Sequence, residues 1–94
     1  MDNANYLRKR FTFYGWVQGV GFRWLAKQAA DDAGATGWVR NEYDGSVILE
    51  LQGTNEQIEA VLNAIKRGRY VRIEHIYEES LPIDSKERRF RTEY

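Results

Sequence analysis

The chain has 94 residues, of which 43% are hydrophobic and 30% are charged, as is typical of one globular domain. Fourteen basic and fourteen acidic residues cancel, so the excess of positive charge common in nucleic-acid-binding proteins is missing, and the lack of cysteine excludes disulfides and thiolate metal sites. There is no apolar run of membrane-spanning length and no signal-peptide core in the first ten residues, so we expect a cytoplasmic protein without membrane or nucleic-acid partners.

The start of the chain predicts a strand, a glycine-containing loop and a helix. Residues 1–7 are polar and without pattern, so we expect a loose N-terminal extension of a single domain that spans residues 1–94. Aromatic residues within 11–14 are typical of a strand, which breaks at Gly15. A helix follows, because apolar residues recur at helical spacing and Gly34 supplies a stop. Its apolar stripe consists of Phe22, Leu25, Ala26, Ala29, Ala30 and Ala33.

Two further strands are predicted to form a hairpin. Residues 36–41 favour a strand, and Asp44-Gly45 is a strong turn sequence. Residues 46–52 have apolar side chains at every second position, which is typical of a strand with one buried face.

A second helix is predicted to begin after Thr54, which forms a capping box with Gln57, and to end at Gly68. Its apolar stripe consists of Ile58, Val61, Leu62 and Ile65. Residues 71–77 alternate as a fourth strand, and the polar stretch 83–89 reads as a loop.

The order of these elements is strand–helix–strand–strand–helix–strand, which is the split βαβ or ferredoxin-like arrangement (βαββαβ) of the α+β class. One apolar stripe on each helix favours two helices packed on one face of an antiparallel sheet. The pattern leaves open whether residues 90–94 add a short fifth strand. This fold supports many unrelated functions, so function has to be argued from a site.

The segment GWVQGVGFR at positions 15–23 is a candidate anion site. Glycines between a strand and a helix can direct several backbone N–H groups at one point, and the helix N-terminus adds more donors and a positive dipole end. Arg23 lies in the first helical turn, and its planar guanidinium suits two phosphate oxygens. The alternative is a tight connection with a solvated Arg23, and spacing alone does not decide between the two. The segment lacks the ending of a Walker A motif and the acidic partner of a dinucleotide site.

Asn41 is a candidate partner of this loop. The two strands of a strand–helix–strand unit run parallel, so their carboxyl ends lie at the same edge of the sheet, and Asn41 ends the second strand. Its uncharged carboxamide is suited to holding a water molecule. The alternative is an asparagine that merely forms the turn before Asp44-Gly45.

Taken together, the two stretches resemble the acylphosphatase family over residues 11–94. The first motif of that family, Gly-x-Val-Gln-Gly-Val-Gly-Phe-Arg, is matched from Gly15 to Arg23. The second motif is Gly-aromatic-Val-basic-Asn, three residues, Gly-x-Val, five residues, Gly. It is matched by Gly37, Trp38, Val39, Arg40, Asn41, Gly45, Val47 and Gly53.

The resemblance implies a ferredoxin-like fold and an enzyme that hydrolyses acyl phosphates to carboxylate and inorganic phosphate. It implies that Arg23 and loop amides bind the phosphate and that Asn41 positions the attacking water. The amides expected to take part are those of Gly19, Val20, Gly21 and Phe22, while Gly15, Trp16 and Gln18 shape the loop and the pocket. Trp16 stands where relatives often carry a basic residue, which makes the pocket mouth less positive and leaves the substrate preference open.

The chemistry requires few residues. A carboxylate with a conjugate-acid pKa of about 4 leaves without protonation, so no general acid is needed. We expect no metal and no cofactor, a small acyl phosphate as substrate, inorganic phosphate as product and inhibitor, and a monomer. Two other functions remain open: a module that binds a phosphorylated ligand without turnover, and a sheet-based RNA binder, whose third strand would need exposed aromatic rings that residues 46–52 lack.

Two other features favour ordinary structural roles. His75, the only histidine, is interpreted as a strand residue rather than a metal ligand. The basic cluster at residues 8–10 is interpreted as solvated surface, like the others in the chain.

Overall fold

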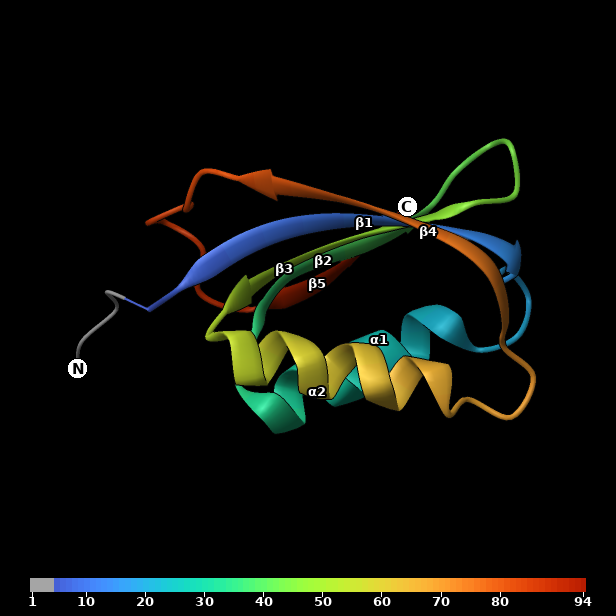
Figure 1. Ribbon diagram of the computed structural model, residues 1–94, viewed down its shortest axis with the longest axis horizontal. Coiled ribbons are helices and arrows are strands. Elements are labelled where there is room, and N and C mark those ends of the chain that lie inside the picture. Colours follow the sequence, from blue (N-terminus) through green and yellow to red (C-terminus); the bar gives the residue numbers. More distant parts are fainter. Residues whose placement is uncertain (1–4) are drawn as a thin grey trace.

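Two helices lie side by side on one face of a five-stranded sheet in the computed structural model, which describes residues 5–94 (Figure 1). The ferredoxin-like order predicted from the sequence is confirmed, and the fifth strand is present. The elements in chain order are β1 Leu7–Trp16, α1 Phe22–Ala33, β2 Thr36–Asn41, β3 Val47–Gly53, α2 Asn55–Lys66, β4 Arg72–Leu81 and β5 Phe90–Glu93.

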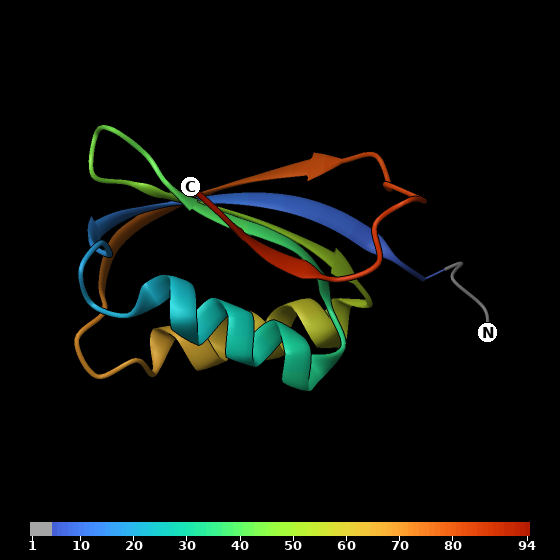
Figure 2. The same cartoon turned by 180° about the vertical axis from the view of Figure 1, so that it is seen from behind.

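The strands are arranged in the order β4-β1-β3-β2-β5. β3 pairs antiparallel with β1 on one side and with β2 on the other, so β1 and β2 run in the same direction. Their carboxyl ends therefore lie at the same end of the sheet, as predicted. That end carries the loop 17–21 and the turn 42–46, on the right of Figure 1 and on the left of Figure 2.

The four strands predicted from the sequence pair antiparallel, as expected, and the fifth strand makes the sheet mixed at one edge. β5 pairs parallel with β2, with Phe90 opposite Gly37. The physical reason is the connection 82–89, which stays at the end of the sheet where β1 and β2 begin and reverses the chain direction after β4. β5 then enters the opposite edge of the sheet in the direction of β2.

The core lies between the helices and one face of the sheet. Phe11 and Phe13 of β1 point into it, and the ring of Phe13 packs edge-on against Phe22 at the start of α1, with centroids 4.9 Å apart. Burial of a side chain of this size contributes about 1.5–3 kcal/mol, so this contact holds the first turn of α1 against the sheet. The other fully enclosed side chains of this core are Val17, Ala26, Ala30, Val39, Val47, Leu49, Leu51, Ile58, Val61, Ile65 and Phe90.

The helix boundaries follow the sequence, with one difference. α2 begins with the predicted capping box, in which the Thr54 hydroxyl accepts from the Gln57 amide at 3.2 Å and Gln57 Oε1 accepts from the Thr54 amide at 2.8 Å. Gly34 ends α1 in the left-handed conformation. Gly68 was expected to end α2 in the same way, but the helix is capped by Arg67, the residue before it. A Cβ on Gly68 would crowd the side chain of Leu25 in α1, so the small size of Gly68 allows the two helices to pack closely.

Two strands are longer than predicted. β1 begins at Leu7, which we had expected in the loose extension, and residues 1–4 of that segment lie outside the described residues. β4 continues to Leu81 rather than ending at Tyr77. In both extensions charged residues stand on both faces of the strand, as at residues 8–10 of β1 and 78–79 of β4, so the alternation that identifies a strand is missing there.

An ionic cluster on this outer face joins β1, β3 and the connection 82–89. We define it as Arg8, Arg10, Glu50, Gln52 and Glu87. Arg8 donates to Glu50 Oε1 at 2.8 Å, to Gln52 Oε1 at 3.1 Å and to Glu87 Oε1 at 2.8 Å, while Arg10 Nε donates to Glu50 Oε2 at 2.7 Å.

Arg8 is only 6% exposed, so its interpretation as solvated surface is wrong. Burial alone would lower the pKa of Arg8, but hydrogen bonds from Arg8 to Glu87 and Glu50 raise that pKa above its ordinary value. The guanidinium is therefore charged and hydrogen-bonded, and it joins β1 to β3 and to the connection 82–89 at the end of the sheet where β1 begins.

Replacing Glu87 by Gln should destabilise the fold, because one buried charge that balances Arg8 is removed. We expect the free energy of unfolding, measured by urea titration, to fall by about 1–3 kcal/mol. Glu78→Gln is the matched control, since Glu78 pairs with Lys9 at an exposed position and should change the value by less than about 1 kcal/mol. Equal effects of the two substitutions would contradict a structural role of the cluster.

Candidate active site

The loop 17–21 between β1 and α1 adopts a conformation that depends on glycine. Gly19 and Gly21 have φ angles of 73° and 82°, in the left-handed region that other residues rarely adopt. A Cβ on either residue would meet nothing within 4 Å, so crowding is not the reason for glycine here. The requirement comes from the path of the backbone, which turns sharply before α1.

A row of backbone donors results from this path. The N–H groups of residues 19–24 donate to no acceptor within residues 5–94, and the first bond into the helix runs from Leu25 N to Gly21 O at 2.9 Å. α1 has no side-chain cap and no acidic residue in its first turn, in contrast to the capped start of α2. Unpaired N–H groups and the positive dipole end suit this position to an anion.

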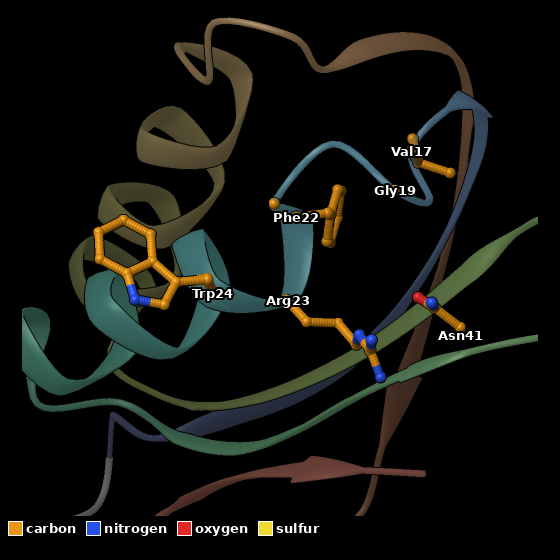
Figure 3. Close-up of a pocket in the computed structure, with 7 residues that line it drawn as sticks. Val17, Gly19, Phe22, Arg23, Trp24 and Asn41 are labelled. Carbon is orange, nitrogen blue, oxygen red and sulfur yellow. The ribbon is translucent and has the colours of Figure 1, made fainter.

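Arg23 and Asn41 meet beneath this loop. They line one pocket of about 190 Å³ although they are 18 positions apart in the sequence. Figure 3 shows the guanidinium of Arg23, from α1, and the carboxamide of Asn41, from the end of β2, directed toward each other. The other lining residues are Val17, Gly19, Gly21, Phe22 and Trp24.

Asn41 presents a buried oxygen to this pocket. Its Oδ1 atom is the one buried side-chain polar atom without a hydrogen-bond partner among the described residues. Leaving such an atom unsatisfied costs about 1–3 kcal/mol, so the site fits a ligand or water that donates to it. The interpretation of Asn41 as a mere turn former does not account for this atom.

Arg23 contacts a residue that the sequence analysis missed. Its guanidinium lies over the ring of Tyr94, 5.2 Å from the centroid, and forms no ion pair within residues 5–94. Cation–π contacts at exposed positions contribute about 0.5–1 kcal/mol. Tyr94 follows β5, and the pairing of β5 with β2 brings it to the site, so no local sequence signal could have identified it.

Gln18 ties the loop to the turn after Asn41. Its Nε2 atom donates to the Glu42 carbonyl at 2.7 Å and to the Ser46 carbonyl at 2.9 Å. The turn is itself ordered by Asp44, whose carboxylate accepts from the Ser46 amide at 2.9 Å and from the Ser46 hydroxyl at 2.6 Å. These hydrogen bonds from Ser46 lower the pKa of Asp44. The loop before Arg23 and the turn after Asn41 are thus held together.

The remaining predicted residues lie beside the pocket rather than in it. Gly15 lies in an irregular part of the β1–β4 pairing, where a Cβ would collide with the carbonyl oxygen of Arg72. Trp16 and Val20 line a neighbouring groove. The predicted residues that the structure brings together in one pocket are Gly19, Gly21, Phe22, Arg23 and Asn41.

Two further lining residues were missed by the sequence analysis. Val17 is buried and lines the pocket. The sequence analysis considered it only as one position of the motif from Gly15 to Arg23. Trp24 is exposed on α1 off the apolar stripe, and a large aromatic side chain at such a position was an available signal.

Within residues 5–94, we find neither a group of side chains that could hold a metal ion nor a helix that could span a membrane. No group of three or more His, Cys, Asp or Glu side chains in this part of the chain could hold a metal ion. His75 lies on β4 beside Tyr77, which confirms its interpretation as a strand residue. Neither described helix has the length and apolarity to cross a membrane.

Comparisons with known proteins identify one family. The acylphosphatase family model matches residues 9–92. An acylphosphatase of Oceanobacillus iheyensis is 40% identical over 82 residues, which cover 85% of this chain and 90% of that protein. An acylphosphatase of Salinibacter ruber is 46% identical over 77 residues and covers 81% of each chain.

A solved structure of the family has the same fold. The crystal structure of acylphosphatase from Bacillus subtilis superimposes with a TM-score of 0.85 at 30% identity, over 94% of this chain and 99% of that one. The family model extends over the loop 17–21, Arg23 and Asn41. The chain therefore belongs to the acylphosphatase family.

Proposed function

We propose that this pocket hydrolyses acyl phosphates, with Arg23 and the loop amides binding the phosphate and Asn41 holding the attacking water. The observation that carries the proposal is the buried, unpartnered Oδ1 of Asn41 facing Arg23 in one pocket. An anion site alone needs only the loop and the arginine. An uncharged acceptor beside it is what an attacking water requires.

The phosphoryl group is stabilised by fixed positive charge. Arg23 and the N–H groups at the start of α1 donate to the equatorial oxygens, on which charge gathers in the transition state. Removing one such donor typically costs about 3–4 kcal/mol of transition-state stabilisation. Because Gly19 and Gly21 are already held in their required conformation, little reorganisation is needed when the substrate binds.

The water attacks in line with the leaving group. Asn41 Oδ1 accepts a hydrogen bond from one O–H group of the water, which directs an oxygen lone pair at phosphorus. The new oxygen–phosphorus bond forms as the bond between phosphorus and the acyl oxygen breaks, and the carboxylate departs with the bonding electrons. A water proton passes to a phosphoryl oxygen, which yields a carboxylate and inorganic phosphate.

The residues around the pocket fit a reaction without a protonated leaving group. A carboxylate whose conjugate acid has a pKa of about 4 departs unassisted, and the pocket lining contains neither a histidine nor a carboxylate side chain. Positioning and charge stabilisation are then the contributions of the protein.

The full chain should hydrolyse benzoyl phosphate at an undiminished rate after treatment with a chelator, and inorganic phosphate should inhibit competitively. Release of benzoate, followed by absorbance, measures both. Binding of phosphate without any hydrolysis would contradict the proposal and would identify instead a module that binds phosphorylated ligands.

Arg23→Gln should impair binding and turnover together, because the guanidinium contacts the phosphate in the ground state and in the transition state. We expect KM to rise and kcat to fall, with kcat/KM lowered by at least about 100-fold. Lys27→Gln removes one positive charge from the same helix, where Lys27 pairs with Asp31 outside the pocket, and should leave activity within two-fold. A loss of the same size in both variants would point to general charge rather than a phosphate contact.

Asn41→Ala should lower turnover while leaving substrate binding almost intact, because the carboxamide contacts the water rather than the substrate. We expect kcat to fall about 100-fold, the typical cost of a misplaced reactant, with KM changed by less than three-fold. Asn63→Ala, at an exposed position of α2, is the control. If KM rises in proportion to the loss of kcat, Asn41 binds the substrate and the assigned role is wrong.

A further inference from the structure

The side chain of Gln18 reaches from the loop 17–21 to the turn 42–46, and the reaction described above gives it no role. Its Nε2 atom lies 2.7 Å from the carbonyl oxygen of Glu42 and 2.9 Å from the carbonyl oxygen of Ser46. A carboxamide nitrogen carries two donor hydrogens, so these two hydrogen bonds use its whole donor capacity. The side chain thereby joins two connections that lie next to each other at the same end of the sheet (Figures 1 and 2).

The two carbonyl groups that Gln18 contacts are those that close the hairpin next to Asn41. Asn41 belongs to the last residue pair of β2 and β3. Directly beyond that pair, the amide of Glu42 donates to the Ser46 carbonyl at 2.9 Å, and the amide of Gly45 donates to the Glu42 carbonyl at 3.2 Å. Each carbonyl therefore accepts one hydrogen bond from within the turn and a second one from Gln18.

The direction of the Asn41 carboxamide depends on the backbone that carries it. Its Oδ1 atom is buried and has no hydrogen-bond partner among residues 5–94, so no protein donor fixes this atom in place. The next residue along the chain is Glu42, whose carbonyl group Gln18 holds. A shift of the turn would therefore carry Oδ1 with it and would move any water bound there out of line with the scissile bond.

The phosphate loop and the strand end that carries Asn41 are anchored unequally. Val17 and Phe22, which flank the loop, are both buried in the core. Beyond Asn41, by contrast, residues 43–45 are exposed. Loss of the Gln18 bonds would consequently free the turn more than the loop, because core packing holds the loop from both sides.

We propose that Gln18 is a positioning residue for the attacking water, because it holds the turn 42–46 so that Oδ1 of Asn41 stays directed into the phosphate pocket. The inference rests on the proposed function, from which the role of Asn41 is taken. Gln18 acts through Asn41 and not on the substrate, since both of its donor hydrogens are bonded to carbonyl groups of the turn. Its removal should therefore lower turnover and leave phosphate binding unchanged.

The test measures hydrolysis of benzoyl phosphate by the variant Gln18→Met, whose unbranched side chain has a similar length but neither donors nor charge. Displacing a reacting group by about 1 Å can cost about 100-fold in rate. We expect a smaller loss of kcat, about ten-fold, because Asn41 keeps its pairing with β3. KM and the inhibition constant of inorganic phosphate should both stay within about three-fold of the values of the unmodified chain.

A second variant, Gln18→Asn, keeps the carboxamide but is one methylene too short to reach both carbonyl groups. It should lose kcat in the same way. Both variants should fold, because Gln18 is only half-buried and lies outside the core, and a urea titration of each checks this.

A double-mutant cycle with Asn41→Ala separates positioning from a general structural effect. Effects of independent sites on kcat multiply, whereas a residue that acts only through another has no further effect once that residue is gone. In the Asn41→Ala background, Gln18→Met should therefore change kcat by less than about two-fold. Losses that multiply would overturn the positioning role.

Two controls use glutamines outside the pocket. Gln28→Met changes an exposed position of α1 and should leave kcat within about two-fold. Gln57→Met breaks the capping box of α2 and should lower the stability of the chain without lowering kcat. A loss of kcat in Gln57→Met as large as that in Gln18→Met would show that stability alone explains the result, and would overturn the inference.

Failure of the inference and failure of the proposed function give different results. Unchanged kcat in both Gln18 variants, with kcat lowered in Asn41→Ala, would overturn the positioning role and leave the proposed function intact. A rise in KM and in the phosphate inhibition constant would also overturn it, because Gln18 would then act on the phosphate loop. Full activity of Asn41→Ala, or no hydrolysis by the unmodified chain, would overturn the proposed function and the inference with it.

Discussion

The position of β3 between β1 and β2 is the constraint on which the site depends. Antiparallel pairing of β3 with both neighbours makes β1 and β2 run the same way, so the loop after one and the turn after the other meet at one end of the sheet. Arg23 and Asn41 come from elements that never pair with each other. They share a pocket only because a third strand sets the spacing and the register of both.

The two helices differ where they begin, and the difference has a physical consequence. α2 satisfies its first N–H groups with the side chains of Thr54 and Gln57. α1 begins at Phe22, after Gly21, without a side-chain cap, so its first N–H groups are left unpaired. The edge contact of Phe22 with Phe13 and the bonds of Gln18 to the turn 42–46 hold this uncapped end in place. Packing thus offsets the missing cap and keeps the donors available to an anion.

Charge is distributed unevenly along the molecule. At the end where β1 begins, the ionic cluster of Arg8, Arg10, Glu50, Gln52 and Glu87 satisfies each of its charged groups. At the opposite end, several arginines lie near the loop 17–21 without acidic partners in the part of the chain that the structure describes. Although the formal net charge is zero, the surface near the phosphate pocket is therefore suited to negatively charged ligands.

The sequence by itself determined the element order, both helices and the turn at Asp44-Gly45, because helical spacing, capping residues and turn residues are local signals. It also predicted that the segment 15–23 and Asn41 lie at the same edge of the sheet, since the strand–helix–strand rule fixes which strand ends are neighbours. Tertiary structure alone decided the parallel edge strand β5, the contact of Tyr94 with Arg23 and the burial of Arg8. Each of these depends on partners far away in the chain, such as Glu87 for Arg8, and no local pattern of side chains encodes a partner at that distance.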